Sequence, residues 1–219
     1  MRTENELAVI RGHEELYART GHLFQAATTE ISCAANDYYT WVTLKDGMAA
    51  RPPMPRDRPA LLTVRKLYRP GVLLDPVATQ QMRTAAAHGA QVRFIADELN
   101  ETIIIDRRVV ILAGDTAHGP RSFSVVWASD VVQAVCSLFD AAWRTSTELE
   151  VYDREMVEIR RLAPRILELL GSGCKDDTAA RTLSLSVRTY RRRVAELMSA
   201  LGASSRFQAG VRARELGLV

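Results

Sequence analysis

The chain has 219 residues, of which 47% are hydrophobic and 25% are charged. This composition excludes a disordered chain. The length is sufficient to bury a sizeable core. The apolar runs are too short to span a bilayer, and charges interrupt every apolar stretch of the N-terminus. We therefore expect a cytoplasmic protein with no secretory signal and no membrane partner.

The net charge of +3 is unevenly distributed along the chain. The stretch from Arg160 to Val219 holds twelve basic and five acidic residues, a surplus of seven positive charges. The first 159 residues therefore carry a net charge of −4. Positive charge gathered in one part of a chain indicates contact with phosphates. We expect two domains with different partners.

The cysteines and histidines of the chain lack the spacing of a metal site. Cys33, Cys136 and Cys174 form no CxxC pair, which argues against a disulfide framework and against a zinc site. His13 and His22 lie nine residues apart on a predicted helix, too far to share an ion. The sequence predicts no metal and no cofactor.

The N-terminal part begins with a predicted helix and a loop. Leu7, Ile10, Leu16, Leu23 and Phe24 recur at helical spacing, which predicts one amphipathic helix from Glu4 to about Glu30. Four prolines between Asp46 and Pro59 predict an exposed loop.

The pattern then changes to strands alternating with helices. Helices are predicted from Pro76 to His88, with Gly89 as the C-cap, and from about Ser129, where Ser-Asp supplies the N-cap. Arg107 and Arg108 separate two strands as in a tight hairpin. The predicted strands are 61–68, 91–96, 102–106, 109–114 and 122–127. This alternation is typical of an α/β domain with a mixed sheet.

The C-terminal part is predicted to be all helical. Residues 147–156 are charge-rich, which predicts a helical or extended linker. Four helices follow, and among them a short helix, a turn at Leu183 to Leu185 and an arginine-rich helix capped by Ser186 have the spacing of a helix-turn-helix. That spacing predicts that the second helix enters the major groove of DNA.

Residues 162–219 resemble the LuxR-type four-helix DNA-binding domain without a gap. The family's opening motif is retained as Leu162, Pro164 and Arg165, although Ile166 replaces its glutamate. Its later positions are matched by Gly173, Ala179, Ser186, Thr189, Leu201, Gly202, Arg206, Gln208 and Ala209. Tyr190, Arg193 and Ala200 stand where the family has valine, histidine and lysine. In the family the last helix, here with Val211, Ala213 and Leu216, pairs two domains on DNA.

The resemblance implies a set of DNA-contacting residues. The family's major-groove face falls on Arg191, Arg192 and Ala195. Its phosphate contacts fall on Lys175, Ser186, Arg188, Thr189 and Arg193. For an isolated run of three arginines a solvated helix face would be the simpler interpretation, but within this motif we expect contact with bases or phosphates.

The stretch 67–114 carries a pattern that resembles one half of a phospholipase-D-like domain, as found in TrmB-like and in some actinobacterial LuxR-type regulators, and the resemblance covers about 80 residues. The enzymes carry His-x-Lys-x-x-x-x-Asp; aligning the Asp on Asp106 puts Leu99 at the His position and Glu101 at the Lys position. Leucine is no nucleophile, and glutamate would repel a phosphate. His88 and His118 have no recognisable partner, so no catalytic residue is expected. Since the enzymes use two facing halves, a single half implies a homodimer.

These observations predict three segments: an α/β sensory or dimerisation domain at 1–145, a linker at 146–158 and an all-α LuxR-type DNA-binding domain at 159–219. We expect a dimeric, sequence-specific transcriptional regulator that is not an enzyme and that binds an inverted-repeat operator on double-stranded DNA. RNA polymerase is a further expected partner, and whether a small-molecule effector binds stays open.

Three alternatives remain. The first is a response regulator; it would need a receiver domain with an acidic pair after its first strand, whereas residues 1–45 read as helical and lack that pair. The second is a DNA-binding protein with residual phosphodiesterase activity, which Leu99 and Glu101 oppose. The third is an architectural DNA binder without sequence preference.

Overall fold

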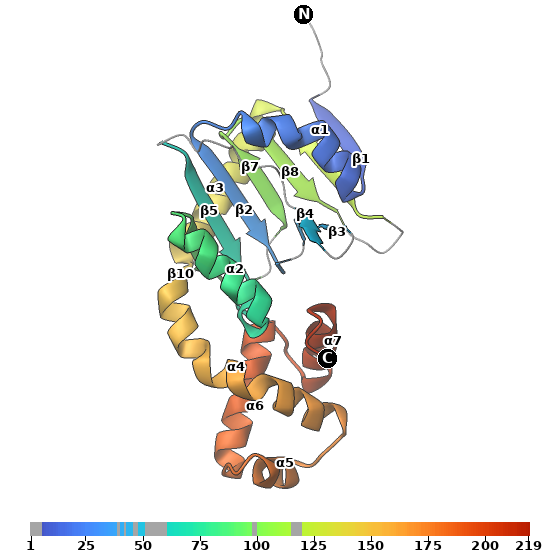
Figure 1. Cartoon of the computed structure of the whole chain (residues 1–219), viewed down its shortest axis with the longest axis vertical. Helices are drawn as coiled ribbons and strands as arrows, with labels where there is room; N and C mark the ends of the chain where they lie inside the picture. Colours follow the sequence, from blue (N-terminus) through green and yellow to red (C-terminus); the bar gives the residue numbers. More distant parts are fainter. Residues whose placement is uncertain are drawn as a thin grey trace, which may run out of the picture. The chain divides into compact units, whose positions relative to one another are not determined.

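The computed structural model of the chain divides into two compact units (Figure 1). The α/β unit comprises residues 1–68, 85–93 and 99–146, and the helical unit comprises residues 69–84, 94–98 and 147–219. The structure describes residues 6–38, 40–41, 43–45, 48–50, 61–97, 100–114 and 120–219.

The α/β unit is built on a mixed sheet in the order β1-β9-β8-β7-β2-β5-β6. Strand β2 runs parallel to β5 and antiparallel to β7, and the β7–β8, β8–β9 and β1–β9 pairs are antiparallel. The strands are β1 (Leu7–Arg11), β2 (Glu30–Ala35), β5 (Thr63–Tyr68), β6 (Gln91–Phe94), β7 (Thr102–Ile105), β8 (Val109–Ala113) and β9 (Ser122–Val126). The short strands β3 (Thr43–Lys45) and β4 (Met48–Ala50) pair separately.

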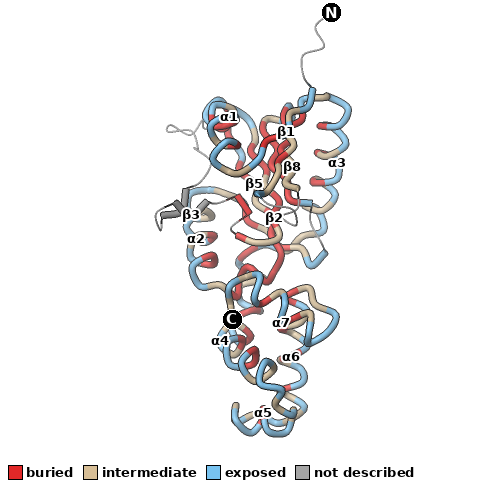
Figure 2. The backbone as a smooth tube through the Cα atoms, turned by 90° about the vertical axis from the view of Figure 1, so that its right-hand side faces the viewer, coloured by how far each residue is buried: buried red, intermediate tan, exposed pale blue. Residues whose placement is uncertain are grey.

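Helices α1 (His13–Gln25) and α3 (Ser129–Thr145) cover opposite faces of this sheet (Figure 2). Side chains alternate between the two faces along each strand. On the α1 face, Phe123 packs edge-on against the His13 ring with centroids 4.9 Å apart. On the α3 face, Arg65 lies over the Phe139 ring, 4.9 Å from its centroid. Both faces are therefore core surfaces of a layered α/β fold.

The single helix predicted from Glu4 to Glu30 is wrong. Residues 7–11 form strand β1, which pairs with β9, and β2 already begins at Glu30. Gly12 separates β1 from α1 with a positive φ of 80°, a conformation that costs glycine little. The four apolar residues that open β1, at positions 7–10, fit a helical stripe as well as a strand, and the pairing with β9 decides between them.

The remaining expectations for this unit are largely confirmed. Strands β5 to β9 and the β7–β8 hairpin lie where the pattern placed them, and α2 (Pro76–Ala87) ends before Gly89, whose φ is 82°. The predicted Ser-Asp cap of α3 is wrong, because Ala128 is the N-cap and no side chain caps it. Of the predicted loop at 46–59, residues 48–50 form β4, and the other residues lie outside the described ones.

The sheet also bears on the receiver alternative. Residues 1–45 are not all helical as predicted, because strands β1 and β2 lie there. However, receiver domains have the parallel doubly wound topology of flavodoxin-like folds, whereas β2–β7, β7–β8, β8–β9 and β1–β9 are antiparallel. The topology therefore speaks against a receiver domain more strongly than the sequence did.

The helical unit contains η1 (Pro70–Leu74), most of α2, the two-residue strand β10 (Thr147–Glu148), and helices α4 (Leu149–Gly171), α5 (Asp176–Thr182), α6 (Val187–Leu201) and α7 (Arg206–Glu215). Helix α4 is continuous through the boundary predicted at residue 159 and contains Pro164. Among the described residues, no helix has the length and hydropathy needed to cross a membrane.

Segment 69–84 packs on the helices of this unit. Arg160 on α4 donates to the Leu73 carbonyl over 2.6 Å and also pairs with Asp153, which in turn pairs with Arg83 on α2 over 2.6 Å. A Cβ on Gly71 would lie 3.1 Å from the Ala200 carbonyl, so η1 and the end of α6 approach closely. The helical unit is therefore larger than the C-terminal helices alone.

Candidate nucleic-acid interface

Helices α5 and α6 meet through small side chains and a short turn. Ala179 and Ala180 are buried on α5, and their size permits a close approach of the two backbones. In the turn, Ser184 has a positive φ of 55°, and the Leu185 amide donates to the Ala180 carbonyl over 2.9 Å. These contacts fix the direction in which the chain enters α6.

Helix α6 begins at a side-chain cap, as predicted. Ser186 Oγ accepts a hydrogen bond from the Thr189 amide over 3.1 Å and lies 2.8 Å from Thr189 Oγ1. Such a cap satisfies one of the free amides of the first turn. The hydroxyl groups of Ser186 and Thr189 therefore already hold each other at the N-terminus of α6.

One face of α6 is buried and the other is cationic. The buried face is made of Tyr190, Val194, Leu197, Ala200 and Leu201, which recur at the helical period. On the opposite face Arg188 and Ala195 are exposed, and the Arg191 and Arg192 side chains are 65% and 64% exposed. The structure thus places four of the predicted DNA-contacting residues on one exposed face, the face a groove could accept.

Arg193 lies apart from these exposed arginines. Its side chain is only 19% exposed, with one guanidinium nitrogen 2.8 Å from Glu196 and another 3.9 Å from Glu158 on α4. Its Nε is buried without a hydrogen-bond partner among the described residues. Arg193 therefore packs between α6 and α4, although the resemblance implied a phosphate contact.

Asp176, which the sequence reasoning missed, connects three helices. Its carboxylate accepts from Arg191 Nε on α6 over 2.8 Å and from Arg206 on α7 over 2.7 Å, while its own backbone starts α5. The Arg206 and Arg191 guanidinium groups lower the pKa of Asp176 to about 2. The neighbouring Lys175, a predicted phosphate contact, is the exposed N-cap residue of α5. An acidic residue at a helix start was the only sequence signal for Asp176.

Helix α7 exposes apolar side chains beside a groove. Phe207 is 83% exposed and Val211 is 43% exposed, while Ala209 and Ala213 are buried on the opposite side of the helix. A groove of about 1140 Å³ runs between α7 and the end of α4 and includes Leu167, Leu170, Phe207, Gly210 and Val211 in its walls. An exposed phenylalanine beside an apolar groove is typical of a surface that a partner covers.

The residues aligned with the catalytic positions of phospholipase-D-like enzymes belong to the α/β unit. Glu101, at the lysine position, is 8% exposed; it pairs with Arg121 and accepts hydrogen bonds from Thr40 Oγ1 and, over 3.2 Å, from the Asn36 amide. The carboxylate is thus already satisfied by the protein. Leu99 and His118 lie outside the described residues, and His88 is exposed after α2.

Asp106 has a structural role in the β7–β8 turn. Its carboxylate accepts from the amides of Thr29 and Glu30 over 2.8 and 2.9 Å, and from Thr28. Burial alone would raise the pKa of Asp106, but the backbone hydrogen bonds lower it to about 2. The φ of Asp106 is 48° and that of Arg107 is 54°, so these hydrogen bonds hold a turn conformation that non-glycine residues rarely adopt.

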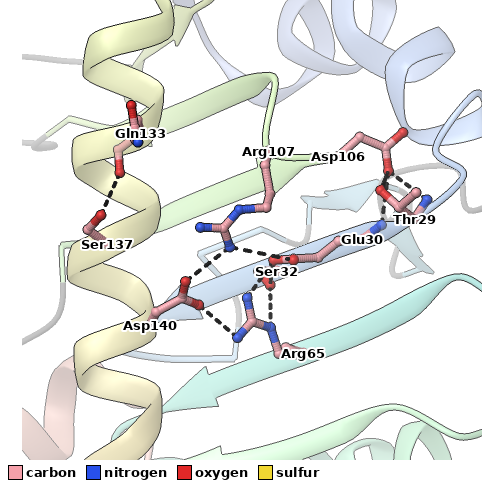
Figure 3. Close-up of polar contacts among 9 residues, drawn as sticks. All are labelled: Thr29, Glu30, Ser32, Arg65, Asp106, Arg107, Gln133, Ser137 and Asp140. Carbon is pink, nitrogen blue, oxygen red and sulfur yellow. Dashed lines mark hydrogen bonds and ion pairs between the residues drawn. The ribbon is translucent and has the colours of Figure 1, made fainter.

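A second charged cluster joins α3 to the sheet (Figure 3). Arg65 lies 2.6 Å from Glu30 and 2.9 Å from Asp140, and its Nε donates to Ser32 over 3.0 Å. Arg107 approaches Asp140 from the hairpin, over 3.0 Å. Burial opposes ionisation of Asp140, yet the hydrogen bonds from Arg65 and Arg107 lower its pKa. Every charge of this cluster has a partner inside the unit, as expected of a structural network.

Comparison with known proteins gives one curated relative. No protein-family model matches the chain. The bialaphos biosynthetic pathway regulatory protein of Streptomyces hygroscopicus is 34% identical over 149 residues, which make up 64% of this chain and 54% of that protein. The chain therefore spans about half the length of the curated relative it matches.

Solved structures give weaker similarities. TrmBL2, described as an archaeal chromatin protein with a novel mode of DNA binding, has a TM-score of 0.48 and 16% identity, covering 68% of this chain and 57% of its own. Nuc of Salmonella typhimurium, a phospholipase D family member, has a TM-score of 0.47 and 15% identity, covering 65% and 98%. These TM-scores lie below 0.5 and do not assign a fold to this chain.

Proposed function

We propose that the chain is a sequence-specific, DNA-binding transcriptional regulator of the LuxR type. The observation that carries the proposal is the exposed cationic face of α6, which follows a capped N-terminus and a short turn from α5. In helix-turn-helix proteins the second helix lies in the major groove with its N-terminal residues at the base edges. The surplus of seven positive charges beyond residue 159 supports the same partner.

The residues divide into two roles in this proposal. Arg191, Arg192 and Ala195 face the bases, because arginine forms bidentate hydrogen bonds with guanine and the small Ala195 leaves room for a base edge. Lys175, Ser186, Arg188 and Thr189 contact phosphates around the groove. Arg193, with its 19% exposure, contacts a phosphate only after leaving Glu196, so we assign it the weakest contribution.

The proposed protein acts as a homodimer on an inverted repeat. A helix-turn-helix unit reads one half-site, and two-fold symmetry in the protein matches two-fold symmetry in the operator. The apolar groove beside Phe207 and Val211 supports pairing of two α7 helices on DNA, as the LuxR resemblance implies. The relative's description as a pathway regulatory protein supports a regulatory role rather than an architectural one.

The α/β unit is proposed as a phospholipase-D-like domain without catalysis, kept for dimerisation or effector sensing. Glu101 in place of the phosphate-binding lysine, already paired with Arg121, supports the loss of phosphate binding. RNA polymerase as a further partner, and cytoplasmic location, follow from the proposed role.

The proposal is tested by binding of the purified chain to duplex DNA, measured by fluorescence anisotropy. Arg192→Ala should weaken binding to a selected site by about 1–3 kcal/mol and relax base preference at one position of each half-site. Arg161→Ala is the matched control, because its side chain on α4 is 68% exposed and also pairs with a glutamate of its own helix. Equal losses of DNA affinity in both variants would show that Arg192 acts only through its positive charge, and would refute its assignment to the major groove.

A further inference from the structure

Strand β1 (Leu7–Arg11) forms one edge of the sheet in the described part of the chain. Its hydrogen bonds to β9 define which of its backbone groups are free. The Glu6 carbonyl accepts from the Trp127 amide over 2.9 Å, and the Gly12 amide donates to the Arg121 carbonyl over 2.8 Å. Because backbone groups alternate in an antiparallel pair, the amides and carbonyls of Leu7, Val9 and Arg11 point away from β9.

Among the residues that the structure describes, positions 7–10 of this edge carry none of the features that normally protect an edge strand. Such strands commonly carry proline, lysine or an inward-pointing charge, or are covered by another element. The strand reads LAVIR, so its one charge, Arg11, stands at its end, and the Leu7 and Val9 side chains are 51% and 60% exposed. Figure 2 looks onto this edge, with α1 on one side of the sheet and α3 on the other. A strand with free backbone groups and exposed aliphatic side chains can therefore add to the sheet here.

We propose that a second copy of this chain covers the edge, and that two β1 strands pair antiparallel around a two-fold axis perpendicular to the sheet. This inference rests on the proposed function, which requires a two-fold dimer. A continuous sheet keeps the α3 faces of both copies on one side, so only residues of equal parity oppose each other. Placing Ala8 opposite its own copy puts Leu7 of each chain opposite Val9 of the other.

This register satisfies both the backbone and the side chains. Leu7 and Val9 have outward-pointing amides and carbonyls, so the Leu7–Val9 pairs exchange hydrogen bonds, and Ala8 forms the non-hydrogen-bonded pair at the axis. The four exposed aliphatic side chains gather into one apolar patch on the α3 face. The neighbouring register, with Val9 on the axis, would place Leu7 opposite the charged Arg11 and is less favourable.

The register is tested by cross-linking the full chain. The Cα atoms of a non-hydrogen-bonded pair lie about 4.5 Å apart, within the range that a disulfide spans. Ala8→Cys should therefore form an interchain disulfide under mild oxidation, as seen by non-reducing electrophoresis. Arg11→Cys should not, because the two copies of residue 11 would lie about 20 Å apart in this register, at roughly 3.4 Å per residue. The unsubstituted chain, with Cys33, Cys136 and Cys174, gives the background.

The surface is tested by sedimentation of the same chain. Val9→Lys places a charge at the new pair and should raise the dimer dissociation constant more than about tenfold. Leu138→Lys is the control, since Leu138 is a 68% exposed aliphatic residue that belongs to helix α3 and not to strand β1. If Val9→Lys fails to fold, the Ala8→Cys result decides alone.

The outcomes separate this inference from the proposed function. A native dimer that Val9→Lys leaves intact and Ala8→Cys does not cross-link overturns the β1 interface, as does a native chain that sediments as a monomer. The proposed function is judged separately by binding of a single half-site duplex, which Val9→Lys should retain at native affinity. If the native chain binds no DNA, the proposed regulatory function is refuted. The β1 interface is then tested by the sedimentation result alone.

Discussion

The arginines of the two units differ in what surrounds them. In the α/β unit, Arg65 is 14% exposed, lies between Glu30 and Asp140, and stacks on Phe139. In the helical unit, Arg191 and Arg192 are about two thirds exposed and each has one carboxylate partner. The same side chain is a structural element in one case and an available cation in the other. Exposure and the number of carboxylates around the guanidinium, not residue type, distinguish the two roles.

The largest expected effect comes from removing the enclosed arginine. Arg65→Met leaves Glu30 and Asp140 without their main partner in a poorly solvated site, and breaking such a pair costs about 3 kcal/mol of the free energy of unfolding. This lies at the low end of the usual range because Arg107 still approaches Asp140. Urea denaturation of the full chain measures the loss.

Arg107→Met is the matched control for that experiment. Arg107 contacts the same carboxylates but is 46% exposed, so its loss should cost about 1 kcal/mol or less. Equal destabilisation by both variants would show that burial does not distinguish these arginines.

The second prediction concerns an exposed arginine. Arg191→Ala should weaken specific DNA binding by about 1–3 kcal/mol while changing the free energy of unfolding by less than about 1 kcal/mol. Anisotropy and urea denaturation of the same preparation provide the two numbers. If Arg191→Ala lowers the free energy of unfolding strongly and leaves DNA binding unchanged, Arg191 is a structural residue like Arg65 and not a DNA contact.

The third prediction uses the pKa of Asp176, which lies at about 2 in the folded chain. A carboxylate with a lowered pKa stabilises the fold above its unfolded pKa of roughly 4, and this stabilisation is lost as the pH falls toward 2. Since Arg191 and Arg206 are about half exposed or more, solvent screening reduces the contribution to about 1 kcal/mol.

Asp176→Asn should therefore destabilise the chain at pH 7, and the difference from the native chain should shrink between pH 4 and pH 2. Denaturation curves across that range measure it. A difference that stays constant with pH would show that the charge of Asp176 is not responsible.

The smallest expected effect is that of Lys175→Ala. As a phosphate contact, Lys175 should weaken binding to every sequence alike and lower the slope of log K against log salt by about one. Titrations at several salt concentrations, on a selected site and on an unrelated duplex, test this. A loss confined to the selected site would instead make Lys175 a base-reading residue.

The sequence predicted the elements whose signals are local. The Ser186 cap, the Gly89 stop and the hairpin at Arg107 each depend on a few neighbouring residues, and each is present. Strand β1 was missed because its identity depends on β9, more than a hundred residues away. The short apolar stretch at positions 7–10 fits the spacing of a helix as well as that of a strand. Gly12 is the one local signal that separates this stretch from the helix that follows.

Long-range ion pairs were equally hidden from the sequence. Asp176 and Arg206 are thirty positions apart, and no local pattern marks them as partners. The contact of Arg160 with Leu73 spans 87 positions and places segment 69–84 in the helical unit. A fragment beginning at residue 159 would cut α4 and lose this contact, so the proposed DNA-binding function is better measured on the full chain.

Selection of duplexes from a random pool by the purified full chain addresses the proposed function itself. The account predicts enrichment of an inverted repeat whose half-sites lie about one helical turn, or 10 base pairs, apart, and loss of that preference in Arg192→Ala. Recovered sequences indistinguishable from the starting pool would contradict sequence-specific recognition by α6.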